Sequence, residues 1–304
     1  MRAVWTFWTK PMKASASWPW LSSKHHLLGW ILSVETAKKH YSKTSLFTDD
    51  EGAKLLIDGL GLEFDYVSKE LNYLDEYDPG WWALGKLYAY RAQQEPFTHI
   101  DSDAFLWKPL PERMLTAPLL AQNPDYFIVG QSEFYRPDKF EALLKRVKEG
   151  WLPEEWIWCR KVFVNHQKGV GCGIFGGNRV DFINYYADLA IKVISHPAND
   201  LAVSGTNEKA RFVILFEQFL LAACIDYHKN RSDSPYQNLD IQYLFDFLED
   251  CFLSADKAGY THLIGKSKSS KDVGNRLEER VKKDYPELYE RCLNLVYKNT
   301  ELVF

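Results

Sequence analysis

The sequence has few cysteines and no excess of positive charge. Its five cysteines are an odd number, spread widely along 304 residues, and no two of them form a CxxC pair. A disulfide framework and a cysteine-based zinc site are therefore not expected, and a reducing, cytoplasmic compartment fits best. The formal net charge of −4 gives no overall basic field that would attract nucleic acid. Any anion that the protein binds must be held by a local group of residues.

Long apolar runs, internal repeats and low-complexity linkers are also missing. No stretch of about 18 apolar residues occurs, and the first residues lack the apolar core and cleavage site of a signal peptide. We therefore expect no transmembrane segment. What the sequence does contain is a hydrophobic fraction of 46%, which can supply a sizeable core for one large domain.

The spacing of apolar residues in the first hundred positions changes repeatedly between strand-like and helix-like. It predicts a loop over 10–19, helices over 24–40, 52–60 and 84–95, and strands over 3–8, 44–48, 63–67 and 97–101. Strands that are separated by helices form parallel βαβ units, and such sheets bind ligands at the carboxyl ends of their strands. The predicted fold class is α/β, with a mixed, mainly parallel sheet flanked by helices.

The second half is less regular but continuous in composition. Its pattern predicts strands over 126–129 and 161–164, a glycine-dense segment over 169–177, and helices over 137–149, 180–191, 208–227 and 276–297. We expect a single domain with two halves, about 1–110 and 111–270, and a C-terminal helical extension over 271–304.

Two carboxylates stand at the end of a predicted apolar strand. Asp101 and Asp103 flank Ser102, and no basic residue nearby in the sequence neutralises them. Such a pair is costly unless a cation binds, and carboxylate oxygens suit hard divalent ions such as Mg²⁺ or Mn²⁺. A short DxD match alone is more often a solvated turn, but apolar residues on both sides of this one favour a buried strand end.

A second group of residues with suitable chemistry begins at His262. The segment reads His-x-x-Gly-x-x-Lys, with Gly265 and Lys268 at the last two motif positions. A neutral imidazole can complete a metal site, glycine lets the backbone approach a phosphate, and a lysine ammonium can neutralise a diphosphate. Taken singly, each of these residues is more often an ordinary surface group.

Together, the two motifs resemble those of the retaining GT-A glycosyltransferases of the glycogenin and bacterial lipopolysaccharide galactosyltransferase type. The resemblance implies a GT-A-like, Rossmann-like fold in which Asp101, Asp103 and His262 bind Mn²⁺ or Mg²⁺ and Lys268 contacts the diphosphate. It also implies that Ser102 and Gly265 line the donor site. The segment 82–103 is similar to uncharacterised bacterial relatives of capsule and polysaccharide transferases.

The same resemblance assigns weaker roles elsewhere in the chain. Gly173 lies in a segment similar to the family's strand at the sugar and acceptor site, although Gly171 stands where asparagine is common. Glu217 replaces the usual aspartate of an Asp-Gln pair, and Lys86 stands where the family often has a basic residue near the phosphates. The first strand and the following loop would bind the nucleotide; the residues concerned are Thr6, Lys10, Asp49 and Asp50.

These expectations define a metal-dependent glycosyltransferase that uses a nucleoside diphosphate sugar and a hydroxyl acceptor, with no nucleic acid partner. An inverting enzyme would need a carboxylate base, for which Glu217 and Asp181 are the candidates. Aromatic residues that could stack on an acceptor are Trp81, Trp82, Trp156 and Trp158. The alternatives are a non-catalytic carbohydrate- or nucleotide-binding protein on the same fold and a sugar nucleotidyltransferase; the latter usually has a glycine-rich loop after its first strand, and Thr9, Lys10 and Pro11 stand there instead.

Overall fold

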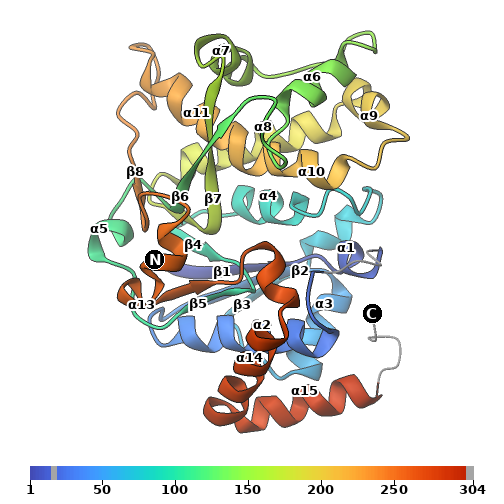
Figure 1. Ribbon diagram of the computed structural model, residues 1–304, viewed down its shortest axis with the longest axis vertical. Coiled ribbons are helices and arrows are strands. Elements are labelled where there is room, and N and C mark those ends of the chain that lie inside the picture. Colours follow the sequence, from blue (N-terminus) through green and yellow to red (C-terminus); the bar gives the residue numbers. More distant parts are fainter. Residues whose placement is uncertain (15–18, 299–304) are drawn as a thin grey trace. The chain divides into compact units, whose positions relative to one another are not determined.

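The computed structural model describes residues 1–14 and 19–298, and the chain divides into two compact units (Figure 1). The first unit comprises Met1–Glu76, Thr98–Pro111 and the chain from Cys251 onward. The second comprises Tyr77–Phe97 and Glu112–Asp250. Both units contain strands and helices, so the predicted α/β class is confirmed. The C-terminal helices belong to the first unit, which is therefore assembled from three separate stretches of sequence.

The first unit is built on strands in the order β3-β2-β1-β4. Their bounds are β1 Arg2–Phe7, β2 Thr44–Thr48, β3 Tyr66–Ser68 and β4 Phe97–Ile100. β1 pairs in parallel with β2, and β2 pairs in parallel with β3. Every residue of β2 and β4 is buried, as expected for strands that are covered on both faces. Two short antiparallel strands, β5 (Ala104–Leu106) and β9 (Tyr260–His262), form a separate ladder.

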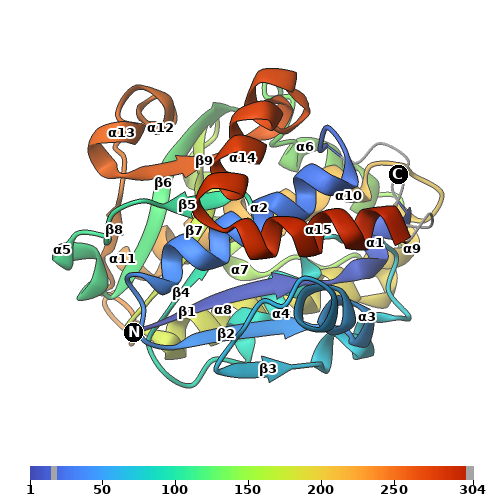
Figure 2. The same cartoon turned by 90° about the horizontal axis from the view of Figure 1, so that it is seen from below.

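Helices cover these strands within the first unit. The long helix α2 (Ser23–Lys38) is buried on nearly all sides and packs against β5. It also packs against α14 (Lys271–Asp284) and α15 (Pro286–Lys298), and α15 lies beside α2 in Figure 2. The shorter elements of this unit are α1 Thr9–Ala14, α3 Asp50–Ala53, the π-helical η1 Lys54–Gly59, η2 Glu70–Leu74, α12 Asp250–Leu253, α13 Ala255–Ala258 and η4 Gly265–Ser269.

The second unit has strands in the order β7-β6-β8. β6 (Leu119–Ile128) pairs antiparallel with β7 (His166–Gly177) and in parallel with β8 (Ile241–Tyr243). Its helices are α4 Leu84–Arg91, α5 Glu112–Leu115, α6 Pro137–Leu144, α7 Glu154–Val162, α8 Val180–Ser195, α9 Pro197–Val203, α10 Lys209–Ile214, the π-helical η3 Leu215–Phe219 and α11 Leu220–Lys229. Aromatic rings of Phe140, Trp156 and Phe216 pack together in its core.

Several predicted elements are wrong in type or extent; the helix predicted over 137–149 ends at Leu144, and the strand predicted over 126–129 begins at Leu119. The predicted loop after the first strand contains α1, and the predicted strand over 161–164 is the end of α7 and the following bend. Short apolar runs do not distinguish a strand from a helix by spacing alone. The single helix predicted over 276–297 is interrupted at Tyr285, whose backbone is not helical. The cause is Pro286, because a proline disfavours the helical conformation of the residue before it.

Two further observations concern the whole described chain. Among residues 1–14 and 19–298, no helix is both long enough and apolar enough to cross a membrane. All five cysteines are buried free thiols.

A buried hydrogen-bond relay fixes the end of β4 to α2. The Trp5 indole N–H donates to Ser33 Oγ over 2.9 Å, and the Ser33 hydroxyl donates to the Asp101 carbonyl over 2.9 Å.

Ser33→Ala should lower the free energy of unfolding by about 1–3 kcal/mol, because a buried indole N–H loses its acceptor. Urea denaturation measures the change. Ser42→Ala, at an exposed serine, is the control and should change it by less than about 0.5 kcal/mol.

Candidate metal centre

The turn between β4 and β5 carries the two aspartates. The N–H of Ala104 donates to the Asp101 carbonyl over 2.9 Å, which closes the turn. The N–H of Leu263 donates to the Asp103 carbonyl over 3.0 Å, which joins the turn to the end of β9. The β5–β9 register places His262 opposite Ala104, the neighbour of Asp103. Strand pairing thus explains how residues far apart in the sequence meet.

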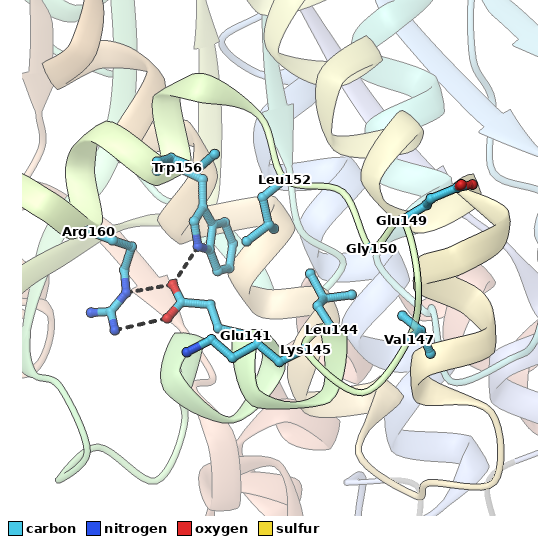
Figure 3. Close-up of a pocket in the computed structure, with 10 residues that line it drawn as sticks. Glu141, Leu144, Lys145, Val147, Glu149, Gly150, Leu152, Trp156 and Arg160 are labelled. Atoms are coloured by element: carbon cyan, nitrogen blue, oxygen red, sulfur yellow. Dashed lines mark hydrogen bonds and ion pairs between the residues drawn. The ribbon is translucent and has the colours of Figure 1, made fainter.

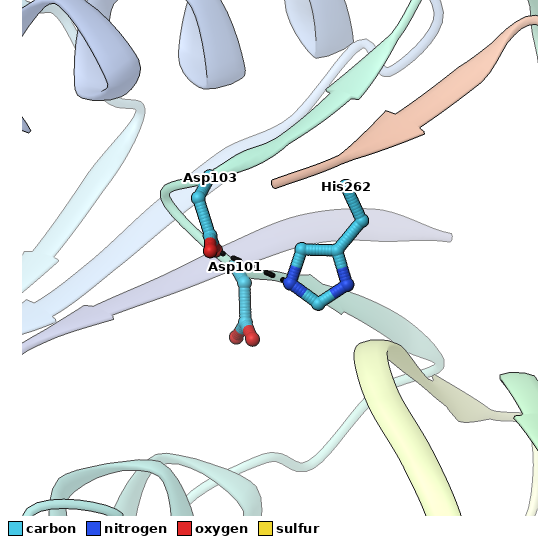
Figure 4. Close-up of side chains that lie close together, drawn as sticks. All are labelled: Asp101, Asp103 and His262. Atoms are coloured by element: carbon cyan, nitrogen blue, oxygen red, sulfur yellow. Dashed lines mark ion pairs between the residues drawn. The ribbon is translucent and has the colours of Figure 1, made fainter. Parts of the chain in front are cut away.

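Asp101, Asp103 and His262 form one cluster in the first unit. Each offers one ligand atom, and these atoms lie within 4.8 Å of one another. Figure 4 shows the two carboxylates and the imidazole ring directed toward a common region. Asp103 is buried, whereas Asp101 and His262 are half-buried, so one side of the cluster is open to a ligand. The three residues that the sequence predicts as metal ligands are therefore brought together.

Lys268 and His262 lie beside the Asp103 carboxylate. Lys268 Nζ contacts Asp103 Oδ2, and His262 Nε2 lies 3.4 Å from Asp103 Oδ1. Burial alone would raise the pKa of Asp103, but Lys268 and His262 outweigh burial and hold this pKa well below its usual range. Asp103 is therefore ionised at neutral pH, as a metal ligand must be.

His99 forms a second layer behind Asp101. Its Nδ1 lies 3.7 Å from Asp101 Oδ1, and its Nε2 lies 3.1 Å from the hydroxyl of Thr6. Groups of this kind orient the residues that bind a metal. Sequence analysis did not single out His99, although a strand period of two places it on the same side as Asp101. Thr6, predicted to bind the nucleotide, is connected through this imidazole to the cluster of Asp101, Asp103 and His262.

Lys268 is held by the segment that precedes α2. The N–H of Leu21 donates to the Lys268 carbonyl over 2.9 Å, and the Lys268 ammonium lies 5.8 Å from the centre of the Trp20 ring. A positive φ of 56° at Gly265 begins the short helix η4 that carries the lysine. Glycine adopts this conformation without steric cost. Lys266, two residues earlier than Lys268, is exposed to solvent.

His26 on α2 is a buried neutral imidazole near this group. The Trp30 indole N–H donates to His26 Nε2 over 3.1 Å. The pKa of His26 is lowered to about 3, mainly by burial and also by the Lys268 charge, while Asp103 opposes the shift. Sequence reasoning missed this residue because a single histidine in an apolar helix carries no pattern.

The low pKa of His26 predicts a loss of stability in acid. Between about pH 6.5 and pH 3 the unfolded chain binds a proton at His26 that the folded chain does not, so stability falls as the pH falls. The contribution is at most about 1.4 kcal/mol per pH unit. His26→Gln keeps an acceptor for Trp30 and should flatten the slope by up to this amount in urea denaturation at pH 7.5, 6 and 5. The exposed His166→Gln is the control; equal slopes in both variants would contradict the prediction.

The other N-terminal candidates have structural partners. Lys10 Nζ donates to the Asp75 carbonyl. Both carboxylate oxygens of Asp49 are engaged, one by Thr9 and the other by the N–H of Gly52, so Asp49 caps α3. Asp50 is exposed and pairs with Lys69. Asp49 is therefore accounted for by the fold.

The remaining predicted site residues lie in the second unit. Glu217, fully buried in η3, accepts a hydrogen bond from Lys86 Nζ over 2.9 Å. π-helical turns such as η3 are rare in proteins, and those that occur are often found at functional sites. Gly173 is buried in β7. Asp181, at the first turn of α8, forms a two-contact ion pair with Arg179 at 2.9 and 2.8 Å and is largely exposed.

Two of the four tryptophans proposed for stacking belong to the core. Trp81 and Trp156 are 3% and 0% exposed, and both pack against Phe216. Their rings therefore present no surface to an acceptor, which corrects the prediction. Trp158 is half-buried, and Trp82 is exposed and donates its indole N–H to the Ala210 carbonyl over 3.0 Å.

A protein family described as a family of unknown function, DUF6734, matches residues 1–295 of the chain. Because the match covers almost the whole sequence, the chain belongs to this family. No curated protein matches the chain.

Proposed function

We propose that this member of the DUF6734 family is a metal-dependent glycosyltransferase of the GT-A type, which transfers a sugar from a nucleoside diphosphate to a hydroxyl acceptor. The observation that carries the proposal is the meeting of Asp101, Asp103 and His262 within 4.8 Å. The position of the cluster after a buried strand of an α/β unit supports it, since such units bind ligands at the carboxyl ends of strands.

The chemistry of the three side chains fits a divalent ion. Two carboxylates and one imidazole form a mixed oxygen and nitrogen donor set, which suits Mn²⁺ and also accommodates Mg²⁺. The ionised state of Asp103 and the half-buried position of Asp101 and His262 agree with a site that keeps positions open for a phosphate. When bound, the ion would act as a Lewis acid that stabilises negative charge on the diphosphate.

Lys268 would act on the leaving group. Its ammonium contacts Asp103, so it already lies beside the carboxylate that would hold the ion. We propose that Lys268 exchanges this contact for a diphosphate oxygen when the donor binds, and that it neutralises the charge that develops as the sugar departs. His99 and Ser33 would keep Asp101 in place through the contacts described above. The motif resemblance favours a reaction with retention of anomeric configuration.

Thermal unfolding with nucleotides tests this function. The melting temperature would be measured with UDP, GDP and CDP, each with and without Mn²⁺, because a ligand that binds only the folded chain raises it. The proposal predicts a rise for at least one nucleotide that requires the metal, followed by metal-dependent hydrolysis or transfer of the matching nucleotide sugar. No response to any nucleotide, or a response indifferent to metal, would contradict the proposal. Metal-dependent binding without turnover for any sugar donor would indicate the non-catalytic alternative.

Two neighbouring lysines provide a matched pair of variants. Lys268→Ala should reduce turnover about 100-fold or more, the size of effect seen when one stabilising group at a developing charge is removed. Its effect on nucleotide binding should be smaller. Lys266→Ala removes the same side chain from an exposed position in the same short helix and should leave turnover within about twofold of the parent. Equal turnover of the two variants would contradict the assignment of Lys268 to the active site.

A further inference from the structure

An apolar surface in the second unit surrounds the end of α7. On this helix the exposed and half-exposed positions recur three and four residues apart, which defines its solvent face. That face carries Ile157, Trp158, Lys161 and Val162, and the exposed fractions of Ile157 and Val162 are 54% and 49%. A solvent face of a helix is normally polar. Two more exposed apolar residues, Phe163 and Val164, follow at once.

Strand β6 extends this apolar surface. Tyr126 and Ile128 are exposed on one side of the strand, whereas Phe127 between them is buried and stacks on Tyr135. Tyr126 and Phe163 line a common hollow of about 250 Å³. We refer to the following exposed set as the α7 surface: Tyr126, Ile128, Ile157, Val162, Phe163 and Val164. Apolar residues gathered in this way mark an interaction site more often than isolated exposed ones do.

The sequence that contains most of the α7 surface is basic, although the protein as a whole is acidic. Residues 139–168 contain seven Lys and Arg against four Glu, a net charge of +3 in a chain of net charge −4. Four of the basic side chains are exposed and form no ion pair within the described residues: Lys145, Arg146, Lys148 and Lys161. The acidic side chains nearby include Glu149 and Glu154, which are exposed, Glu141, which is paired with Arg160, and Asp226, which lines the hollow and is paired with Lys168 over 2.9 Å.

A shallow groove beside α7 has the same mixed character (Figure 3). It encloses about 460 Å³, and its apolar wall includes Leu144, Leu152 and Ile157. Arg160 donates to both oxygens of Glu141 over 2.7 and 3.2 Å and stays at the wall of the groove. Apolar and charged side chains, among them Lys145 and Arg160, therefore line the same groove.

We propose that the α7 surface binds the surface of an anionic lipid bilayer. Its apolar side chains would enter the boundary between headgroups and acyl chains, and its lysines would meet the negative headgroups. Charge decides against a second copy of the chain, because a symmetric contact would set each basic segment against another basic segment. A hydrophilic polyanion would match the basic segment but leave the six apolar side chains without a partner. The proposal does not depend on the proposed transferase activity.

Vesicle sedimentation with the full chain tests this inference. The chain should sediment with vesicles that contain phosphatidylglycerol, bind pure phosphatidylcholine at least about tenfold more weakly, and lose binding as the salt concentration rises.

Val164→Ser should weaken binding to the phosphatidylglycerol vesicles several-fold. Its control, Leu201→Ser, changes a residue of the same 64% exposed fraction in the same unit and should bind like the parent. Lys161→Glu should weaken binding about tenfold or more, unlike Lys43→Glu at another exposed lysine.

Hydrogen exchange gives a second readout that needs no variant. Vesicles of phosphatidylglycerol should slow amide exchange in residues 157–168 of the parent chain. The inference is overturned if the parent does not bind, if both lipid compositions bind equally, or if Val164→Ser and Leu201→Ser behave alike. A reversible dimer that Val164→Ser dissociates, without vesicle binding, would instead identify a second copy as the partner and also overturn it.

Discussion

Asp103→Asn is expected to abolish metal-dependent nucleotide binding, with a loss of affinity of at least about 100-fold, because even an indirect supporting residue of a metal site contributes 10- to 100-fold. Asp103 contributes the most buried carboxylate of the cluster, and its charge is maintained by Lys268 and His262. An amide of the same size removes the charge and one anionic ligand atom. Calorimetric titration of nucleotide in the presence of Mn²⁺ measures the loss.

The control for this variant is Asp58→Asn. Asp58 is exposed in η1, so the same loss of one carboxylate there should leave the affinity unchanged. Asp101→Asn should reproduce the loss, since Asp101 belongs to the same cluster. Nucleotide binding that stays metal-dependent and undiminished in Asp103→Asn would show that the cluster is not the binding site.

Lys86→Met is expected to produce the largest change in stability, about 3–5 kcal/mol in the free energy of unfolding. The Lys86 ammonium lies 2.9 Å from Glu217 Oε1, and the Glu217 side chain is 0% exposed. Removal of the ammonium takes the charge partner away from a fully buried carboxylate, which water cannot solvate. The double variant Lys86→Met/Glu217→Gln should recover much of the loss, because it removes both charges.

Lys209 provides a closely matched control in the same unit. Its side chain is 13% exposed, against 15% for Lys86, and each ammonium lies 5.8 Å from a tryptophan ring. The difference is in the partners: Lys209 pairs with Asp78 and Asp200, which are 45% and 61% exposed and can be solvated when the lysine is lost. Lys209→Met should therefore cost about 1 kcal/mol or less. Urea denaturation of both variants compares a buried with an exposed carboxylate, and equal losses would contradict the reasoning.

Several parts of this structure follow from local sequence patterns. The strands β2 and β4 and the long helix α2 lie where the pattern of apolar residues predicts strands over 44–48 and 97–101 and a helix over 24–40. The meeting of His262 with the aspartates was expected because the two motifs together resemble those of a known family. Nothing local encodes the β5–β9 pairing that produces it, so only the resemblance to a known family made this prediction possible.

Other parts could not be predicted from local patterns. The glycine-dense segment 169–177 carries no clear strand pattern, yet it lies in β7. A Cβ at Gly169 would lie 2.7 Å from the Tyr135 hydroxyl and one at Gly171 would lie 2.5 Å from Asn123 Oδ1, so close neighbours from other segments explain these glycines. The apolar run Val162, Phe163 and Val164 resembled a strand, but it is the exposed end of α7 and the bend that follows. The spacing of so short a run does not distinguish a strand from a helix. Ser33, His26 and His99 act through contacts between distant segments, which no single stretch of sequence reveals.

The most direct test of the central claim is pulsed electron paramagnetic resonance of Mn²⁺ added to the chain. If Asp101, Asp103 and His262 share one ion, the spectrum will show the magnetic coupling of one directly bound nitrogen, and His262→Gln will remove this coupling while Mn²⁺ still binds more weakly to the aspartates. An Mn²⁺ spectrum without nitrogen coupling, or a coupling that persists in His262→Gln, would contradict the account.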